Sequence, residues 1–154
     1  MNLLDTYSFC LNFLVLVVLN SISLIFVKTV NNNFFDNSKK IYTVFKWEQR
    51  FYSRFLKINF WKDKLPQHIG KNGFSKKNIA SLNKNYLKAF VVETCRAEWF
   101  HLFFIISSFF CLFFNKVFWP VVLCMFVNLP FVFIQRYNRI RISKLIIRKT
   151  KIKT

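Results

Sequence analysis

Acidic residues and histidines are scarce in this chain. Six Asp and Glu stand against 24 Lys and Arg, and the only imidazoles are His68 and His101. The cysteines are scattered with no Cys-x-x-Cys pair, at positions Cys10, Cys95, Cys111 and Cys124. Two imidazoles and isolated thiols do not assemble a zinc site, so we expect no metal and no cofactor. The same scatter gives no information on the redox compartment.

The chain is also short, and its 154 residues leave no room for a second catalytic domain. Yet 54% of them are hydrophobic, with 22 Phe, beside a net charge of +18. Apolar runs separated by basic runs are typical of a membrane protein whose basic parts meet anionic headgroups or anionic substrates. Nucleic-acid binding is a competing explanation of the charge. Because the apolar runs need a bilayer first, we expect no nucleic-acid partner.

The first apolar run covers residues 9–27 and ends at Lys28, close to the ~20 residues of a spanning helix. A cleaved signal peptide is the alternative. The N-terminal region, however, carries Asp5, has no Lys or Arg, and lacks a small-x-small cleavage site. The run therefore predicts a retained transmembrane helix.

Two further apolar runs, 97–114 and 117–134, predict a helical hairpin, and we expect a helix from Ile79 that leads into the first of these runs. Only Asn115 and Lys116 separate them, so the two helices should be antiparallel. The first run is free of charge and imidazole only from Leu102 onward, which leaves open whether it spans fully. The fold prediction is an all-α integral membrane protein in one membrane domain, with three transmembrane helices.

The distribution of Lys and Arg predicts the orientation in the membrane. Segment 28–96 holds 15 of them, the tail 135–154 holds 8, and the turn at 115–116 holds one. Three spans place the two basic segments on one side, and basic segments favour the cytoplasm. We expect a multi-pass cell-membrane protein with its N-terminus outside and its C-terminus in the cytoplasm.

Within 28–96, the stretch "VFKWEQRFYSRFLKI" predicts an amphipathic helix. Its apolar positions fall within about 80° of arc at 100° per residue; they are Val44, Trp47, Phe51, Phe55 and Ile58. Basic residues occupy the other side, namely Lys46, Arg50, Arg54 and Lys57. Such a helix suits the headgroup plane of a membrane, although it could instead pack on another element of the protein.

Polar residues occur in two places where polarity is costly in a membrane. In "ETCRAEWFH", Glu93 and His101 share a helix face, Arg96 can neutralise Glu93, and Glu98 can polarise His101 as a general base. In "FVNLPFVFIQRYNRIR", a continuous helix at 100° per residue places Gln135 and Arg139 each within about 20° of Asn128.

Antiparallel pairing makes these two stretches face each other. A turn at 115–116 sets His101 level with Pro130, and Glu98 level with Phe133. A structural explanation competes with a site, because arginines after a transmembrane helix are commonly topology anchors. That explanation suits Arg141 and the later tail. Acidic residues at a membrane end are harder to explain without partners.

The patterns E-T-x-R-A-E-x-x-H and N-x-P-x4-Q-R-Y-N-R-x-R resemble the glycosyl-4,4′-diaponeurosporenoate acyltransferase family. The similarity covers roughly residues 40–148 and includes "FWKDKLP". The resemblance implies transfer of a fatty acyl group to the C6 hydroxyl of a glucose on a C30 carotenoid acid, in staphyloxanthin-type carotenoid synthesis. The His-x4-Asp pattern of glycerol-phosphate acyltransferases is absent after His101, and the chain is too short for the large multi-span O-acyltransferases.

On this basis we assign site residues as hypotheses. The catalytic candidates are His101, Glu98 and Glu93, with His101, steered by Glu98, as the base. The substrate-binding candidates are Arg96, Asn128, Gln135, Arg136, Tyr137, Asn138, Arg139 and Arg141. Among them Arg139, Arg136 and Gln135 would bind the oxyanion, or the phosphate or carbonyl of the acyl donor.

The expected partners are a lipid-soluble glycoside, an acyl donor and anionic membrane lipids. The alternative to an enzyme is a non-catalytic membrane subunit, whose amphipathic helix and basic tail anchor or recruit a partner. In that case direct contact between the two polar stretches would leave no room for substrate. A weaker alternative is nucleic-acid or anionic-lipid binding through the tail "RISKLIIRKTKIKT".

Overall fold

The computed structural model describes residues 3–65, 79–114 and 118–151, and its regular elements there are all helical. The elements are α1 (Leu3–Thr29), η1 (Asn32–Phe35), η2 (Lys40–Tyr42), α2 (Lys46–Arg50), η3 (Phe51–Phe55), α3 (Ile58–Trp61), α4 (Lys84–Ser108), α5 (Cys111–Phe114) and α6 (Trp119–Lys151). The predicted all-α class is confirmed. The predicted turn at 115–116 and His68 lie outside the described residues.

The chain forms two compact units, and the long helices α4 and α6 contribute to both. The first unit comprises Met1–Val30 and Trp99–Val132, and the second comprises Asn31–Glu98 and Phe133–Thr154. Three helical stretches are long and apolar enough to cross a membrane: Thr6–Thr29, Lys84–Phe113 and Trp119–Lys151. The predicted number of candidate spans is therefore confirmed.

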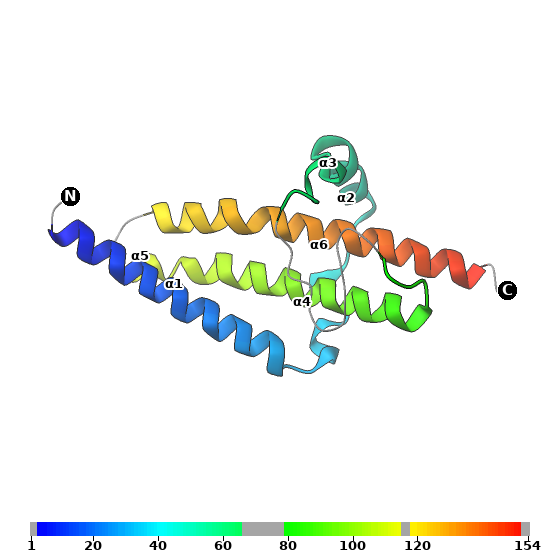
Figure 1. Ribbon diagram of the computed structural model, residues 1–154, viewed down its shortest axis with the longest axis horizontal. Coiled ribbons are helices and arrows are strands. Elements are labelled where there is room, and N and C mark those ends of the chain that lie inside the picture. Colours follow the sequence, from blue (N-terminus) through cyan, green and yellow to red (C-terminus); the bar gives the residue numbers. More distant parts are fainter. Residues whose placement is uncertain (1–2, 66–78, 115–117, 152–154) are drawn as a thin grey trace. The chain divides into compact units, whose positions relative to one another are not determined.

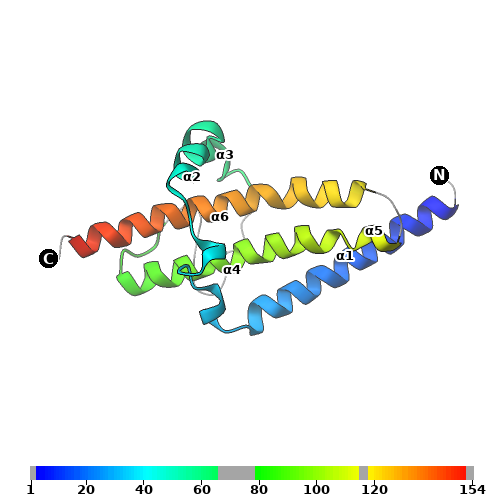
Figure 2. The same cartoon turned by 180° about the vertical axis from the view of Figure 1, so that it is seen from behind.

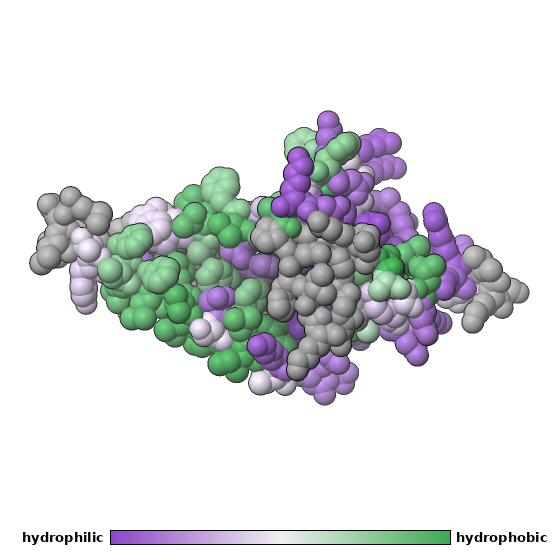
Figure 3. All heavy atoms as spheres, viewed as in Figure 1, coloured by the Kyte–Doolittle hydropathy of each residue, from purple (hydrophilic) through white to green (hydrophobic). Residues whose placement is uncertain are grey.

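In the first unit, the side chains of α1 show the reverse of the pattern in a soluble protein. Phe13 and Ile25 are about two-thirds exposed, at 63% and 62%, whereas Asn12 and Ser23 are buried. Figure 3 shows the resulting hydrophobic surface along α1. Such an extended apolar surface is stable in lipid and unfavourable in water. Within this unit Phe9 stacks on Trp119, with ring centroids 5.6 Å apart, and Phe26 stacks on Trp99 at 4.3 Å.

Helix α4 begins well before the apolar run at 97–114. Asn83 caps its first turn, because the Oδ1 atom of Asn83 accepts the backbone N–H of Asn85 at 3.0 Å. The helix ends at Ser108, where the hydroxyls of Ser107 and Ser108 bond to carbonyls three residues back. Such bonds compete with the α-helical ladder, which accounts for the break before α5.

Helix α6 continues beyond the predicted apolar run, through Pro130 and on to Lys151. Most of the segment predicted as a basic tail, 135–154, is therefore helical. Within the second unit the start of α4 and the end of α6 lie side by side (Figures 1 and 2). They bury a cluster of apolar side chains: Leu87, Phe90, Val91 and Ile142.

The predicted amphipathic segment is helical but divided. It comprises α2, a π-helical turn at η3 and α3, and the break falls at Lys57, which has a left-handed backbone with φ 46°. The indole Nε1–H of Trp61 bonds to the Leu56 carbonyl at 2.8 Å, which closes this turn.

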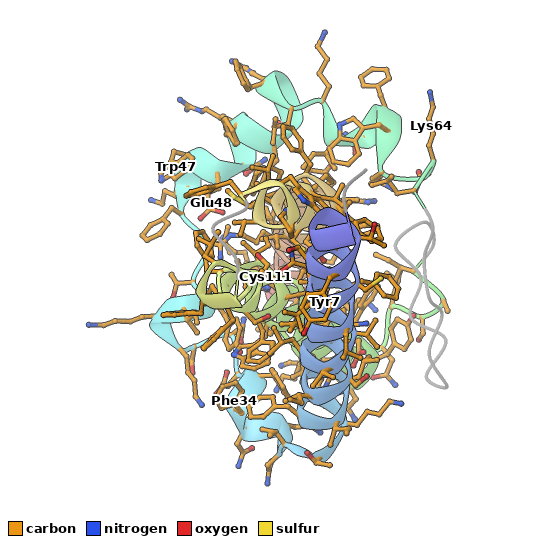
Figure 4. The ribbon with its side chains drawn as sticks, turned by 90° about the vertical axis from the view of Figure 1, so that its left-hand side faces the viewer. Tyr7, Phe34, Trp47, Glu48, Lys64 and Cys111 are labelled. Atoms are coloured by element: carbon orange, nitrogen blue, oxygen red, sulfur yellow. The ribbon has the colours of Figure 1, made fainter. Side chains whose placement is uncertain are left out.

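The faces of this segment also differ from a simple apolar-inside pattern. Glu48, Tyr52 and Ile58 are buried, while Trp47 is 62% exposed and Phe55 is 77% exposed. Figure 4 shows Trp47 on the outer side of α2 and Glu48 on its inner side. Tyr52 and Ile58 pack on Ile134 and Tyr137 of α6, forming the other core of the second unit. The inner face is set by this packing and by the partner of Glu48, described below.

Candidate active site

Two sets of polar side chains were predicted near the middle of α4 and α6. The structure divides them between the two units, and each unit is described by itself. In the second unit, Glu98 of α4 is completely buried. Its Oε1 atom accepts from Nη1 of Arg136 at 2.6 Å, and its Oε2 atom pairs with Nη2 of Arg139. Both carboxylate oxygens of Glu98 are therefore engaged by arginines.

Arg139 is the most deeply buried cation in the described part of the second unit, at 1% exposure. Besides Glu98, its guanidinium donates to the Tyr42 carbonyl at 2.7 Å and to the Thr94 hydroxyl at 3.2 Å. It also lies over the Tyr42 ring, 5.6 Å from the centroid. Burial raises the pKa of the Tyr42 phenol to about 12, so this ring stays neutral beneath the guanidinium.

Arg136 also binds a second carboxylate, that of Glu48, which is not among the site residues predicted from the sequence. Its Nε and Nη2 atoms donate to the two oxygens of Glu48, each at 2.8 Å. Glu48 also accepts the backbone N–H of Phe45 at 3.1 Å and the hydroxyl of Tyr52 at 2.8 Å. An available signal was that Glu48 is one of only six acidic residues, placed inside a basic segment.

The environment of Glu48 shifts the pKa of its own carboxyl and the pKa of the neighbouring Tyr52 phenol. Burial raises the pKa of the Glu48 carboxyl, but the hydrogen bonds from Arg136, Phe45 and Tyr52 outweigh it, and the net pKa is lowered. Burial and the bond to this carboxylate raise the pKa of Tyr52. Glu48 is thus held ionised beside a neutral phenol.

Glu48, Glu98, Arg136 and Arg139 form a four-charge cluster with two negative and two positive groups. Each charge has an opposite charge as a direct hydrogen-bond partner, so the cluster is neutral as a whole. A buried, fully paired network of this kind holds its elements in one arrangement. It joins α2, α4 and α6 of the second unit.

Glu93 and Arg96 contact each other and residues outside the four-charge cluster. The Oε2 atom of Glu93 accepts from Nη1 of Arg96 at 2.7 Å, and the pair is partly exposed. Arg96 also binds the side chain of Asn32 and lies 5.2 Å over the ring of Phe35. The predicted neutralisation of Glu93 by Arg96 is thus present as a direct contact.

In the first unit, His101 of α4 pairs with Asn128 of α6. The Nδ1 atom of His101 lies 2.9 Å from Oδ1 of Asn128. The imidazole ring stacks on Phe131, with centroids 4.9 Å apart and planes 10° from parallel. Among the described residues, Nε2 of His101 has no hydrogen-bond partner. This histidine has one nitrogen held and the other available, which is the arrangement that a general base requires.

Of the remaining predicted residues, which lie in the second unit, Tyr137 and Arg141 make contacts outside the four-charge cluster. The Tyr137 hydroxyl bonds to Oδ1 of Asn59 at 2.6 Å, and the exposed guanidinium of Arg141 lies 5.9 Å over the Tyr137 ring. Asn138 is buried, and its Nδ2 atom has no partner within the described ranges. The side chain of Gln135 makes no hydrogen bond to a described residue. The predicted steering of His101 by Glu98 stays a prediction, since the observed partners of the two residues are different.

The described residues contain no group of three or more His, Cys, Asp or Glu side chains able to hold a metal ion. All four cysteines are free thiols; Cys10 is exposed, and Cys95, Cys111 and Cys124 are buried.

Comparison with known proteins identifies relatives of the chain. Residues 38–148 match the family described as glycosyl-4,4′-diaponeurosporenoate acyltransferase. Proteins of that name from Staphylococcus aureus strains bovine RF122 / ET3-1 and USA300 are each 24% identical over 152 residues, covering 93% of this chain and 89% of theirs. No solved structure matches the chain. The predicted resemblance is confirmed.

Proposed function

Because the chain belongs to the glycosyl-4,4′-diaponeurosporenoate acyltransferase family, and so is an acyltransferase of that type, we propose that it transfers a fatty acyl group to a sugar hydroxyl. The acceptor is the glucose C6 hydroxyl of a glycosylated carotenoid acid or of a related glycolipid. The acyl donor is an activated ester or thioester. Both the acceptor and the fatty chain are lipid-soluble, which suits a protein whose described helices have so much exposed apolar surface.

The observation that carries this proposal is the Nε2 atom of His101, which has no hydrogen-bond partner in the described part of the chain. In the reaction, Nε2 removes the proton from the sugar hydroxyl as its oxygen bonds to the acyl carbon of the donor. The bond between that carbon and the leaving atom of the donor breaks, and the leaving group takes the proton back from His101. The products are the acylated glycoside and the free leaving group.

The predicted substrate-binding residues differ in how well their observed contacts suit a role in binding substrate. Arg136 and Arg139 are already paired with carboxylates, so we assign them to holding the four-charge cluster together with Glu98. Gln135 keeps a side-chain amide without a described partner and is the better candidate for a polar group of a substrate. Arg96, Tyr137, Asn138 and Arg141 stay predictions as substrate ligands, and Glu93 stays a prediction as a catalytic residue.

The protein is proposed to be integral to the cell membrane, with its N-terminus outside and its C-terminus in the cytoplasm. The length and hydropathy of three helices support insertion, and the clustering of Lys and Arg supports the orientation. The segment 45–60 carries an aromatic-basic surface that suits anionic headgroups. This surface consists of the exposed side chains of Phe45, Lys46, Trp47, Arg50, Arg54, Phe55, Lys57 and Phe60.

The proposal is tested by complementation. A Staphylococcus aureus strain lacking its glycosyl-4,4′-diaponeurosporenoate acyltransferase receives this chain, the His101→Ala variant, or the Ile106→Ala variant. Ile106 is 65% exposed on the same helix and serves as the matched control. Mass spectrometry of the extracted pigments and lipids should show the acylated glycoside with the unchanged chain and with Ile106→Ala, but not with His101→Ala. An unchanged lipid profile with all three genes would contradict the proposed function.

A second candidate is a non-catalytic membrane subunit, and one observation favours it. Glu98 is in direct contact with Arg136 and Arg139, as expected for ion pairs whose role is to hold two helices together. In that case His101→Ala would leave every lipid product unchanged, while variants of the four-charge cluster would impair assembly. Equal product formation by the unchanged chain and His101→Ala, at equal protein levels in the membrane, would thus favour the subunit over the enzyme.

A further inference from the structure

The partner of His101 is an amide and not a carboxylate. His101 and Asn128 both belong to the first unit, and Asn128 is 5% exposed. An asparagine side chain presents an acceptor oxygen and a donor nitrogen, so the proton on the imidazole depends on which of the two faces the ring.

The other end of Asn128 decides this orientation. Its Nδ2 atom donates to the backbone carbonyl of Cys124 at 2.9 Å, one turn earlier in α6. A carbonyl oxygen accepts hydrogen bonds and does not donate them, so the nitrogen of the amide must face Cys124. The oxygen then faces His101 and requires a proton on Nδ1. In the neutral ring that leaves Nε2 unprotonated, with its lone pair available.

The plane of the imidazole is set by a second residue of the same helix. Phe131 stacks on the ring at 4.9 Å, and the spacing of Cys124, Asn128 and Phe131 places them along one face of α6. One face of α6 therefore supplies Asn128 as the hydrogen-bond acceptor, the Cys124 carbonyl that orients it, and the Phe131 ring on which the imidazole stacks. The histidine comes from α4.

We propose that Asn128 is a positioning residue, which holds His101 in the Nδ1–H tautomer and thereby keeps Nε2 as the proton acceptor for the sugar hydroxyl. This inference rests on the acyl-transfer function proposed above and makes its site more specific. Asn128 thereby takes the orienting role that is predicted for Glu98 from the sequence. Asn128 does not contact the reacting atoms, and it exchanges no proton with the ring.

The first test reads the tautomer directly and needs no substrate. The chain is labelled with 15N-histidine, placed in lipid nanodiscs, and its two imidazoles are distinguished with a His101→Gln variant. At a pH where the ring is neutral, Nδ1 of His101 should carry the proton. In Asn128→Leu the population should shift toward the Nε2–H tautomer. A wild-type His101 protonated at Nε2 would overturn the inference.

The second test compares rates in the complemented strain after a pulse of labelled fatty acid. Asn128→Leu should slow formation of the acylated glycoside at least tenfold, since correct general-base action contributes about 10²–10⁴-fold. Asn128→Asp keeps an acceptor for Nδ1–H but loses the donor to the Cys124 carbonyl, so it should recover only part of the rate that is lost in Asn128→Leu. Val127→Ala, exposed and next in sequence, is the matched control. Immunoblots of membranes verify equal protein levels.

The outcomes separate this inference from the proposed function. Loss of product in His101→Ala together with a full rate in Asn128→Leu would overturn the positioning role and leave the acyl-transfer function standing. No acylated product from the wild-type chain would contradict the proposed function, while the nanodisc spectra would still decide whether Asn128 sets the tautomer. Slow transfer by Asn128→Leu, with partial rescue by Asn128→Asp, would support both.

Discussion

The guanidinium of Arg136 donates two hydrogen bonds of 2.8 Å to the carboxylate of Glu48, which is 88 residues away in the sequence. Bidentate pairs of this kind are the strong form of the ion pair. The pair ties the short helix α2 to α6 in the second unit. The same guanidinium binds Glu98, so one arginine connects the segment 31–65 to the core of its unit.

Replacing Glu48 with Gln should destabilise the protein. The substitution leaves Arg136 with one carboxylate in place of two, and removing one partner of a buried ion pair typically costs about 3–5 kcal/mol. We expect a lower midpoint for thermal unfolding in detergent, followed by the far-ultraviolet helical signal. Asp36→Asn changes an exposed carboxylate and should have little effect. An unfolding midpoint equal to that of wild type would show that the Arg136–Glu48 pair adds no net stability.

The stabilisation by Glu48 should disappear in acid. Its pKa is lowered in the folded protein from the ordinary value of 4.5, so folding favours the ionised form. The stabilising contribution is therefore full above about pH 4.5 and is lost as the pH falls through the folded pKa. The unfolding midpoints of wild type and Glu48→Gln should differ most near pH 7, and the difference should shrink progressively as the pH falls below about 4.5. A constant difference across this range would assign the stabilisation to another cause.

Phe131→Leu should reduce acyl transfer without abolishing it. The substitution removes the surface on which the His101 ring stacks, while the bond from His101 to Asn128 remains. We expect a several-fold lower rate of product formation in pulse labelling, and a smaller loss than in His101→Ala. Phe126→Leu, which changes a 76% exposed ring of the same helix, is the control. A rate in Phe131→Leu as low as that of His101→Ala would imply that Phe131 itself contacts a substrate.

Trp47 should lie at the level of the lipid headgroups. It is 62% exposed on the aromatic-basic surface, and aromatic rings prefer the membrane interface. In a variant with Trp47 as the only tryptophan, the other three being replaced by Phe, brominated lipids should quench its fluorescence. Bromine near the headgroup should quench more than bromine near the end of the acyl chain. Lack of quenching at both depths would place this surface away from lipid.

The orientation can be tested by labelling single cysteines in intact cells. In a cysteine-free background, a membrane-impermeant maleimide should label Tyr7→Cys and should spare Arg148→Cys until the cells are permeabilised. Both positions are exposed in the structure. The reverse pattern would show that the 23 Lys and Arg of the two basic segments do not face the cytoplasm.

Much of the fold follows from local properties of the sequence. The three candidate spans are set by the length of the apolar runs, and the resemblance rests on two short motifs around Glu93–His101 and Asn128–Arg141. Helix ends were less well predicted. The helix expected from Ile79 begins at Lys84. Hydropathy does not fix this start, because a helix continues through polar residues wherever one face is packed.

The sequence by itself determined the all-α class, the number of candidate spans and the two polar stretches that carry the family resemblance. It could not pair the charges, because the partners of a carboxylate are set by side-chain positions far along the chain. Only the tertiary structure shows that Glu48 faces inward and binds Arg136, and that both carboxylate oxygens of Glu98 bind arginines. It also shows that His101 contacts the side-chain amide of Asn128, whose orientation is set by a hydrogen bond to the carbonyl of Cys124. Burial is the physical reason: a polar group removed from water must find a partner nearby, and proximity in space is a property of the fold.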